Sequence, residues 1–143
     1  MFALSKNNGF KQTGGNLVYM IDDDLELCEL VKIALETRNY KVKYALDGEK
    51  GLKMLMKKPP DLLLLDIKMP KVTGYELLQK IHSTPKLADI PIIVLTVITK
   101  GSRKSDEEWR DSMDVSDFIT KPFEPMDLLK RVDRILKEES LKS

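Results

Sequence analysis

Short hydrophobic runs alternate with amphipathic segments along the chain from Leu17 onward. Short apolar runs bounded by turn-forming residues are typical of buried β-strands. The pattern predicts strands at Leu17–Ile21, Tyr40–Ala45, Asp61–Leu65, Pro91–Leu95 and Ser116–Thr120.

The segments between these runs have the spacing of amphipathic helices, with apolar residues three and four positions apart. Asp24 and Asp47 precede the first two helices as expected N-caps, because a carboxylate oxygen there accepts an amide hydrogen bond from the first turn. A more polar helix is expected at about residues 102–113. The apolar positions of the other four helices are Leu27, Leu30, Val31, Ala34 and Leu35, then Leu52, Leu55 and Met56, then Leu77, Leu78 and Ile81, and finally Leu128, Leu129, Val132, Ile135 and Leu136.

Strict alternation of strands and helices predicts an α/β fold, a doubly wound parallel sheet of five strands with helices on both faces. The first, third and fourth runs are almost entirely apolar, as in strands covered on both sides, whereas residues 40–44 alternate and suit an edge strand. In such sheets, ligands bind outside the carboxyl ends of the strands. The residues at those ends are therefore the candidates for function.

Composition narrows the classes of protein that fit. The 143 residues suit one domain, with 42% hydrophobic residues, 33% charged residues and a formal net charge of +1. This balance excludes a basic nucleic-acid-binding tail and a fully disordered chain. The single Cys28 cannot form an internal disulfide, and the apolar stretch Pro91–Ile98 is too short to cross a bilayer, so we expect a cytoplasmic domain without a membrane partner. Residues 1–15 lack periodicity and are expected to form a flexible leader, before a domain at 16–139 and a tail at 140–143.

Acidic, hydroxyl and ammonium groups follow the predicted strands. Asp22 and Asp23 come after the first, Asp66 after the third, Thr96 after the fourth and Lys121 after the fifth. The carboxyl ends of parallel strands share one edge of the sheet, so these groups should converge. Clustered carboxylates repel one another unless a cation neutralises them, and Mg²⁺ is the expected ion, since it takes one or two carboxylates together with phosphate oxygens. A carboxylate can then accept a phosphoryl group, while an ammonium and a hydroxyl hold the other phosphate oxygens.

Four sequence motifs, taken together, are specific enough to indicate a resemblance to one known family. They are VYMIDDD at 18–24, LLLLDIKMP with a glycine at 62–74, IIVLT at 92–96 and FITKPF at 118–123. With these motifs, the chain from about Leu17 to Lys137 resembles the receiver domain of two-component response regulators. The resemblance implies a flavodoxin-like (βα)₅ fold with strand order 2-1-3-4-5.

The resemblance also implies roles for single residues. Asp66 corresponds to the phosphoacceptor, and Asp22, Asp23, Asp66 and the backbone carbonyl of Lys68 to the ligands of Mg²⁺. Thr96 corresponds to the switch hydroxyl, and Phe118 to the aromatic switch residue. Lys121 corresponds to the lysine that pairs with the acceptor, and its bond to Pro122 is expected to be cis.

A receiver of this kind is a signalling domain rather than a turnover enzyme. The resemblance implies that a sensor histidine kinase or phosphotransfer protein donates the phosphoryl group from phosphohistidine. A downstream protein would then bind the face formed by the helix at 102–113, the fifth strand and the last helix. We expect no direct contact between this domain and nucleic acid.

Two departures from the family pattern leave alternatives open. Val97 stands where a small residue is usual, and the segment at 97–105 is longer than usual. Val97 is therefore expected to narrow access to the acceptor and to slow both its phosphorylation and its hydrolysis, unless the longer segment carries it away. A degenerate receiver that serves only as a docking scaffold is one alternative. An aspartyl-phosphate phosphatase is another, although such enzymes need a second aspartate where this chain has Lys68.

Overall fold

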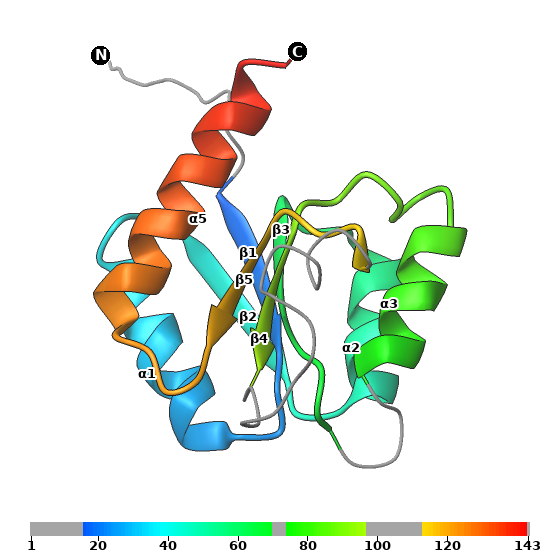
Figure 1. Cartoon of the computed structure of the whole chain (residues 1–143), viewed down its shortest axis with the longest axis horizontal. Coiled ribbons are helices and arrows are strands. Elements are labelled where there is room, and N and C mark those ends of the chain that lie inside the picture. The colour runs from blue at the N-terminus through cyan, green and yellow to red at the C-terminus, as the bar shows by residue number, and fades with distance from the viewer. Residues whose placement is uncertain (1–15, 70–73, 97–112, 143) are drawn as a thin grey trace, which may run out of the picture.

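The protein forms one parallel sheet of five strands in the order β2-β1-β3-β4-β5 (Figure 1). We describe residues 16–69, 74–96 and 113–142 of a computed structural model of the chain. The predicted fold class and the strand order implied by the family resemblance are both confirmed. The strands are β1 Leu17–Ile21, β2 Lys41–Ala45, β3 Leu62–Asp66, β4 Ile92–Thr96 and β5 Asp117–Thr120.

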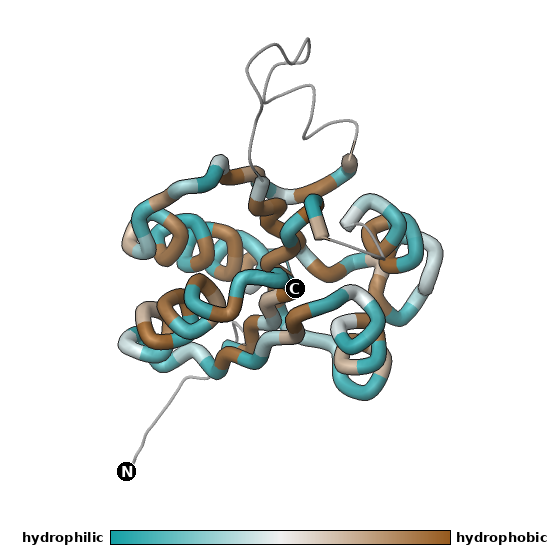
Figure 2. The backbone as a smooth tube through the Cα atoms, turned by 90° about the horizontal axis from the view of Figure 1, so that it is seen from below, coloured by the Kyte–Doolittle hydropathy of each residue, from teal (hydrophilic) through white to brown (hydrophobic). Residues whose placement is uncertain are grey.

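Helices cover both faces of the sheet, α1 and α5 on one side and α2 and α3 on the other (Figure 1). Alternate strand residues serve the two sides: Val18 and Met20 pack in the cluster with α1 and α5, whereas Tyr19 and Ile21 pack with α2 and α3. Figure 2 shows hydrophobic and hydrophilic positions alternating around the helices, as expected when one side faces the sheet. The helices are α1 Leu25–Glu36, α2 Gly48–Lys57, α3 Gly74–Ser83 and α5 Pro125–Ser140. Within residues 16–69, 74–96 and 113–142, no helix is long and apolar enough to cross a membrane.

The strand bounds differ from the prediction by one residue at the starts of β2, β3, β4 and β5 and at two carboxyl ends. Asp66 and Thr96 are the last residues of β3 and β4 rather than the residues that follow them. The reason is that the parallel ladder continues by one residue, with Asp66 opposite Leu95 and Thr96 opposite Thr120. The leader at 1–15, Val97 and most of the expected helix at 102–113 lie outside the described residues.

Both expected N-caps are confirmed. Asp24 accepts a hydrogen bond from the amide of Leu27 at 3.1 Å, and Asp47 accepts one from the amide of Lys50 at 2.8 Å. Each carboxylate satisfies an amide that the first helical turn leaves without a partner. Asp24 therefore has a structural role at the start of α1.

Gly74 lets the start of α3 lie directly against the end of β3. Its amide donates to the carbonyl of Ile67 at 2.8 Å. A Cβ atom at this position would lie 2.3 Å from the Cα of Ile67 and 2.4 Å from the carbonyl oxygen of Asp66. A side chain at position 74 would thus press on the backbone of Asp66, at the carboxyl edge of the sheet.

We expect Gly74→Ala to lower the free energy of unfolding by about 2 to 3 kcal/mol, because backbone atoms must shift to accept the methyl group. Gly51→Ala is the matched control. Its Cβ would lie 2.5 Å from Cδ1, 2.8 Å from Cγ1 and 3.1 Å from Cγ2 of the buried Ile21 side chain, and it meets side-chain rather than backbone atoms. The control should lose less stability than Gly74→Ala, because a side chain in the core adjusts more easily than backbone and because alanine favours the helix. Urea denaturation of both variants measures the difference, and equal losses would contradict this account of Gly74.

Candidate functional site

Three carboxylates meet at the carboxyl edge of the sheet, as the sequence predicts. Strands β1 and β3 are neighbours, so Asp22, which follows β1, lies beside Asp66 at the end of β3. An oxygen from each of Asp22, Asp23 and Asp66 lies within 4.8 Å of the other two. Asp22 and Asp66 are buried, whereas Asp23 is exposed. The cluster therefore has a closed inner side and an open outer side.

Lys121 reaches into this cluster from the turn after β5. Its Nζ lies 2.7 Å from Oδ2 of Asp22 and 3.6 Å from Oδ2 of Asp66. The Lys121–Pro122 peptide bond is cis, as expected. The resemblance implies a pairing with Asp66, and the structure adds a shorter contact with Asp22. The ammonium is thus shared between both buried carboxylates.

Backbone amides fix the orientation of the same two carboxylates. The amide of Asp24 donates to Oδ1 of Asp22, and the amide of Lys68 donates to Oδ1 of Asp66, each at 3.0 Å. The Oδ2 atom of each carboxylate is the one nearest the Lys121 ammonium. One oxygen of each acid is thus held by the backbone, and the other faces the lysine.

Burial and mutual repulsion make Asp66 a weak acid by the standards of aspartate. Burial is the main cause and the charge of Asp22 adds to it, while the Lys68 amide and the Lys121 ammonium act in the opposite direction. Together they raise the pKa of Asp66 from 3.8 to about 6. Burial disfavours the charge on Lys121, but the hydrogen bond to Asp22 and the nearby carboxylates outweigh it and raise the pKa of this lysine. Near neutral pH, Lys121 therefore carries its positive charge, whereas the ionised form of Asp66 is destabilised by its surroundings.

The chemistry of the cluster fits a divalent cation. When all four groups are ionised, the three carboxylates and one ammonium carry a formal charge of −3 + 1 = −2. Carboxylate oxygens are the ligands that Mg²⁺ prefers, and the exposed Asp23 leaves room for the water and phosphate oxygens that this ion keeps. Asp22, Asp23 and Asp66 could therefore hold Mg²⁺ at the open side of the site.

Thr96 and Phe118 lie on the two strands nearest Lys121. Thr96 is buried at the end of β4, and its carbonyl accepts a hydrogen bond from the amide of Lys121 at 2.7 Å. Phe118 is also buried and lies opposite Val94 in the ladder, within the cluster that faces α2 and α3. Thr96 thus lies on the strand next to the one that carries the predicted acceptor, and Phe118 lies one strand farther out.

Sequence reasoning missed one polar cluster at the start of β5. Asp117, the first residue of β5, is buried and is paired with Arg131 and Arg134 of α5. The signal was present in the chain, since a buried strand rarely carries an aspartate without a cation. Arg131 and Arg134 are three residues apart on the last predicted helix and therefore share one of its faces.

Comparison with known proteins gives one consistent result. The model of the response regulator receiver domain family matches residues 18–133. The DNA-binding dual master transcriptional regulator RpaA of Synechocystis sp. is 37% identical over 120 residues, which make up 84% of this chain and 48% of that protein. The phosphate regulon transcriptional regulatory protein PhoB of Pseudomonas aeruginosa is 31% identical over 86% of this chain and 52% of its own length. This chain therefore spans about half the length of these two curated relatives.

A solved structure agrees with this family match. The crystal structure of a putative response regulator from Chloroflexus aurantiacus resembles this chain with a TM-score of 0.75 and 30% identity. The match covers 86% of this chain and 98% of the Chloroflexus chain.

The raised pKa of Asp66 predicts a pH-dependent stability change. In buffer without divalent cations at pH 8, Asp66→Asn should raise the free energy of unfolding by about 1 to 3 kcal/mol, because the amide avoids an unfavourable buried charge. The carboxylate of the unfolded chain ionises near pH 3.8 and that of the folded chain near 6. The free energy of unfolding of the parent protein therefore falls as the pH rises from 3.8 to about 6, and it stays lower above that range. Urea denaturation from pH 3.5 to 8 should show the two proteins converging below pH 4, and a constant difference at every pH would contradict the assignment.

Proposed function

Because the chain belongs to the response regulator receiver domain family, we propose that Asp66 accepts a phosphoryl group from a phosphohistidine donor in a reaction that requires Mg²⁺. The observation that supports this best is the acidic cluster, in which Asp22, Asp23 and Asp66 lie within 4.8 Å. The Nζ of Lys121 lies 2.7 Å from Asp22 and 3.6 Å from Asp66, the two buried acids. These groups would supply the acceptor, the cation site and the phosphate-binding ammonium that the proposed reaction needs.

In the proposed reaction, a carboxylate oxygen of Asp66 attacks the phosphorus atom of the donor. A P–O bond forms, the P–N bond breaks, and the imidazole of the donor leaves with the electron pair. Bound Mg²⁺ would supply charge neutralisation for the phosphoryl oxygens. The Lys68 amide orients the acceptor carboxylate, and Lys121 turns from Asp22 toward a phosphoryl oxygen. We assign the backbone carbonyl of Lys68 to the metal as a further ligand.

The phosphoryl group adds negative charge and acceptor oxygens at the end of β3. We propose that the Thr96 hydroxyl moves toward it and that the Phe118 side chain fills the space that Thr96 leaves. Both side chains are buried in the structure, so a change in one requires its neighbours to repack. The phosphoryl group thereby alters the outer surface near β5.

We propose that the donor is a sensor histidine kinase or a phosphotransfer protein, and that the output is a protein contact at β5, α5 and the segment at 102–113. The named relatives RpaA and PhoB are transcriptional regulators about twice as long as the region that they share with this chain. The formal net charge of +1 favours a protein partner over direct contact of this domain with nucleic acid. The family match disfavours a phosphatase, and the complete acidic cluster disfavours a scaffold that never accepts phosphate.

Acetyl phosphate with MgCl₂ should add one phosphoryl group to the protein, detected by intact-mass spectrometry. The adduct should be absent from Asp66→Asn and absent when a chelator replaces MgCl₂. Asp24→Asn is the matched control, because Asp24 caps α1 and asparagine can accept the same amide bond. It should be labelled like the parent. Labelling of Asp66→Asn would refute Asp66 as the acceptor.

Mg²⁺ should stabilise the folded protein through the acidic cluster. A concentration ten times the dissociation constant should add about 1.4 kcal/mol to the free energy of unfolding, because the ion binds the folded state. Asp23→Asn should lose most of this gain and Asp24→Asn should keep it. Thermal unfolding with and without MgCl₂ provides the measurement, and NaCl at matched ionic strength serves as the salt control. An equal gain in all three proteins would exclude Asp23 as a ligand.

A further inference from the structure

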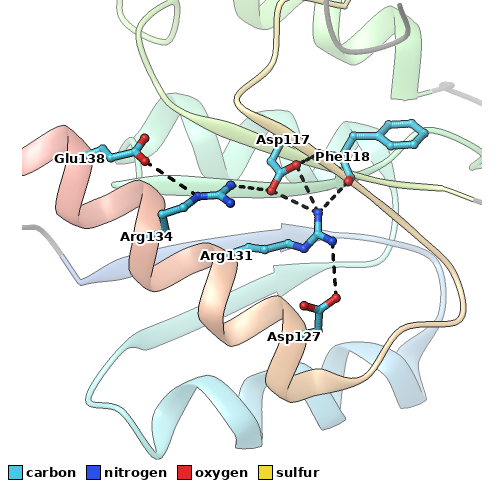
Figure 3. A network of polar contacts seen from close by, with 6 residues as sticks. All are labelled: Asp117, Phe118, Asp127, Arg131, Arg134 and Glu138. Carbon is cyan, nitrogen blue, oxygen red and sulfur yellow. Dashed lines mark hydrogen bonds and ion pairs between the residues drawn. The ribbon is translucent and has the colours of Figure 1, made fainter. Parts of the chain in front are cut away.

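The backbone of Phe118 is bonded on both of its polar groups by side chains. Its amide donates to Oδ1 of Asp117 at 2.8 Å, and its carbonyl accepts from Nη1 of Arg131 at 3.0 Å. The same Nη1 lies 3.3 Å from each carboxylate oxygen of Asp117. Asp117, Arg131 and Phe118 therefore form a closed ring of polar contacts between β5 and α5 (Figure 3).

The two arginines of α5 have different roles in this network. Arg134 donates to Oδ2 of Asp117 at 2.8 Å and pairs with Glu138 at 3.9 Å. Only Arg131, of these two, also contacts the backbone of Phe118, and it further pairs with Asp127 at 3.5 Å. In Figure 3 the ring of Phe118 points away from both arginines, while its carbonyl points toward Arg131. Arg131 thus restrains the backbone of Phe118 and leaves its side chain on the opposite side of the strand.

This restraint lies three residues before Lys121. Farther along the strand, the amide of Lys121 donates to the carbonyl of Thr96 at 2.7 Å. The segment 118–121 is therefore paired with β4 along its length and is held in addition from α5 at Phe118. Lys121 must cross from this segment to Asp22 and Asp66, so a shift of the segment displaces its ammonium from both acids.

We propose that Arg131 is a positioning residue for phosphoryl transfer, which acts through the backbone of Phe118 to hold Lys121 at the acceptor. This inference rests on the proposed function of Asp66. Arg131 itself lies on α5 and pairs with Asp117 and Asp127 rather than with the acidic cluster. Arg131 contributes by fixing the position of β5. This matters because a small displacement of the Lys121 ammonium would remove a large part of its stabilising effect on the phosphoryl group.

The test compares two arginine-to-methionine variants of the full chain. Arg131→Met keeps an unbranched apolar side chain and removes the donors to Phe118, whereas Arg134→Met removes a partner of Asp117 and leaves Phe118 bonded. With acetyl phosphate and saturating MgCl₂, Arg131→Met should be phosphorylated about tenfold more slowly than the parent, the factor expected for one charge-assisted hydrogen bond. Arg134→Met should stay within about twofold of the parent, because the charge of Asp117 keeps Arg131 as its partner. Arg131→Lys should recover part of the lost rate, since its ammonium can donate to the Phe118 carbonyl.

A double-mutant cycle separates positioning from a general loss of structure. If Arg131 acts through Lys121, then Arg131→Met should cause no further slowing in a Lys121→Met background. Urea denaturation of every variant checks that the chain is folded at the assay temperature. The same tenfold loss in the Lys121→Met background would overturn the proposal, and so would equal rates for Arg131→Met and the parent. If the parent itself takes up no phosphoryl group at Asp66, the proposed function fails and this inference fails with it.

Discussion

The repulsion between two buried carboxylates on neighbouring strands is the constraint around which this end of the molecule is built. Asp22 and Asp66 are almost inaccessible to water, and their oxygens approach one another at the end of β1 and β3. Burial of like charges is tolerated only where opposite charge and hydrogen bonds compensate for it. The Lys121 ammonium and two backbone amides provide that compensation in this structure. The rest of the fold holds these carboxylates in place, and the cluster could accept a further cation.

Much of the site could be predicted because, in a parallel sheet, the residues that end the strands all lie at one edge. The hydrophobic runs of β1, β3 and β4 are so continuous that their ends are unambiguous within one residue. Polar residues at such ends lie at the same edge of the sheet, and the sequence therefore predicts that Asp22, Asp66 and Lys121 lie together. The distances between these side chains could not be predicted in the same way. That Lys121 lies nearer Asp22 than Asp66 depends on the turn after β5 and on side-chain torsions, which hydrophobic periodicity does not encode.

The network around Asp117 shows a second limit of sequence reasoning. An aspartate at the start of a strand is usually attributed to the preceding turn, because this residue is common in turns. Its burial becomes clear only when α5 packs across β5 and brings Arg131 and Arg134 to it. The polar sequence at 102–113 has too weak a hydrophobic pattern to fix the bounds of the helix expected there, and most of that segment lies outside the described residues. The strongly apolar strands were thus predicted well, whereas the polar cluster of Asp117, Arg131 and Arg134, which joins residues far apart in the sequence, was not.

The contacts of Phe118 also bear on the solubility of the folded chain. β2 and β5 are the outer strands of the sheet, and an outer strand can recruit a strand of another molecule through its unpaired backbone groups. On β5, side chains of Asp117 and Arg131 already occupy the amide and the carbonyl of Phe118. On β2, Lys41 and Lys43 are exposed and would place charge against any incoming strand. Both outer strands of the sheet therefore carry side chains that oppose intermolecular β-sheet aggregation and strand exchange.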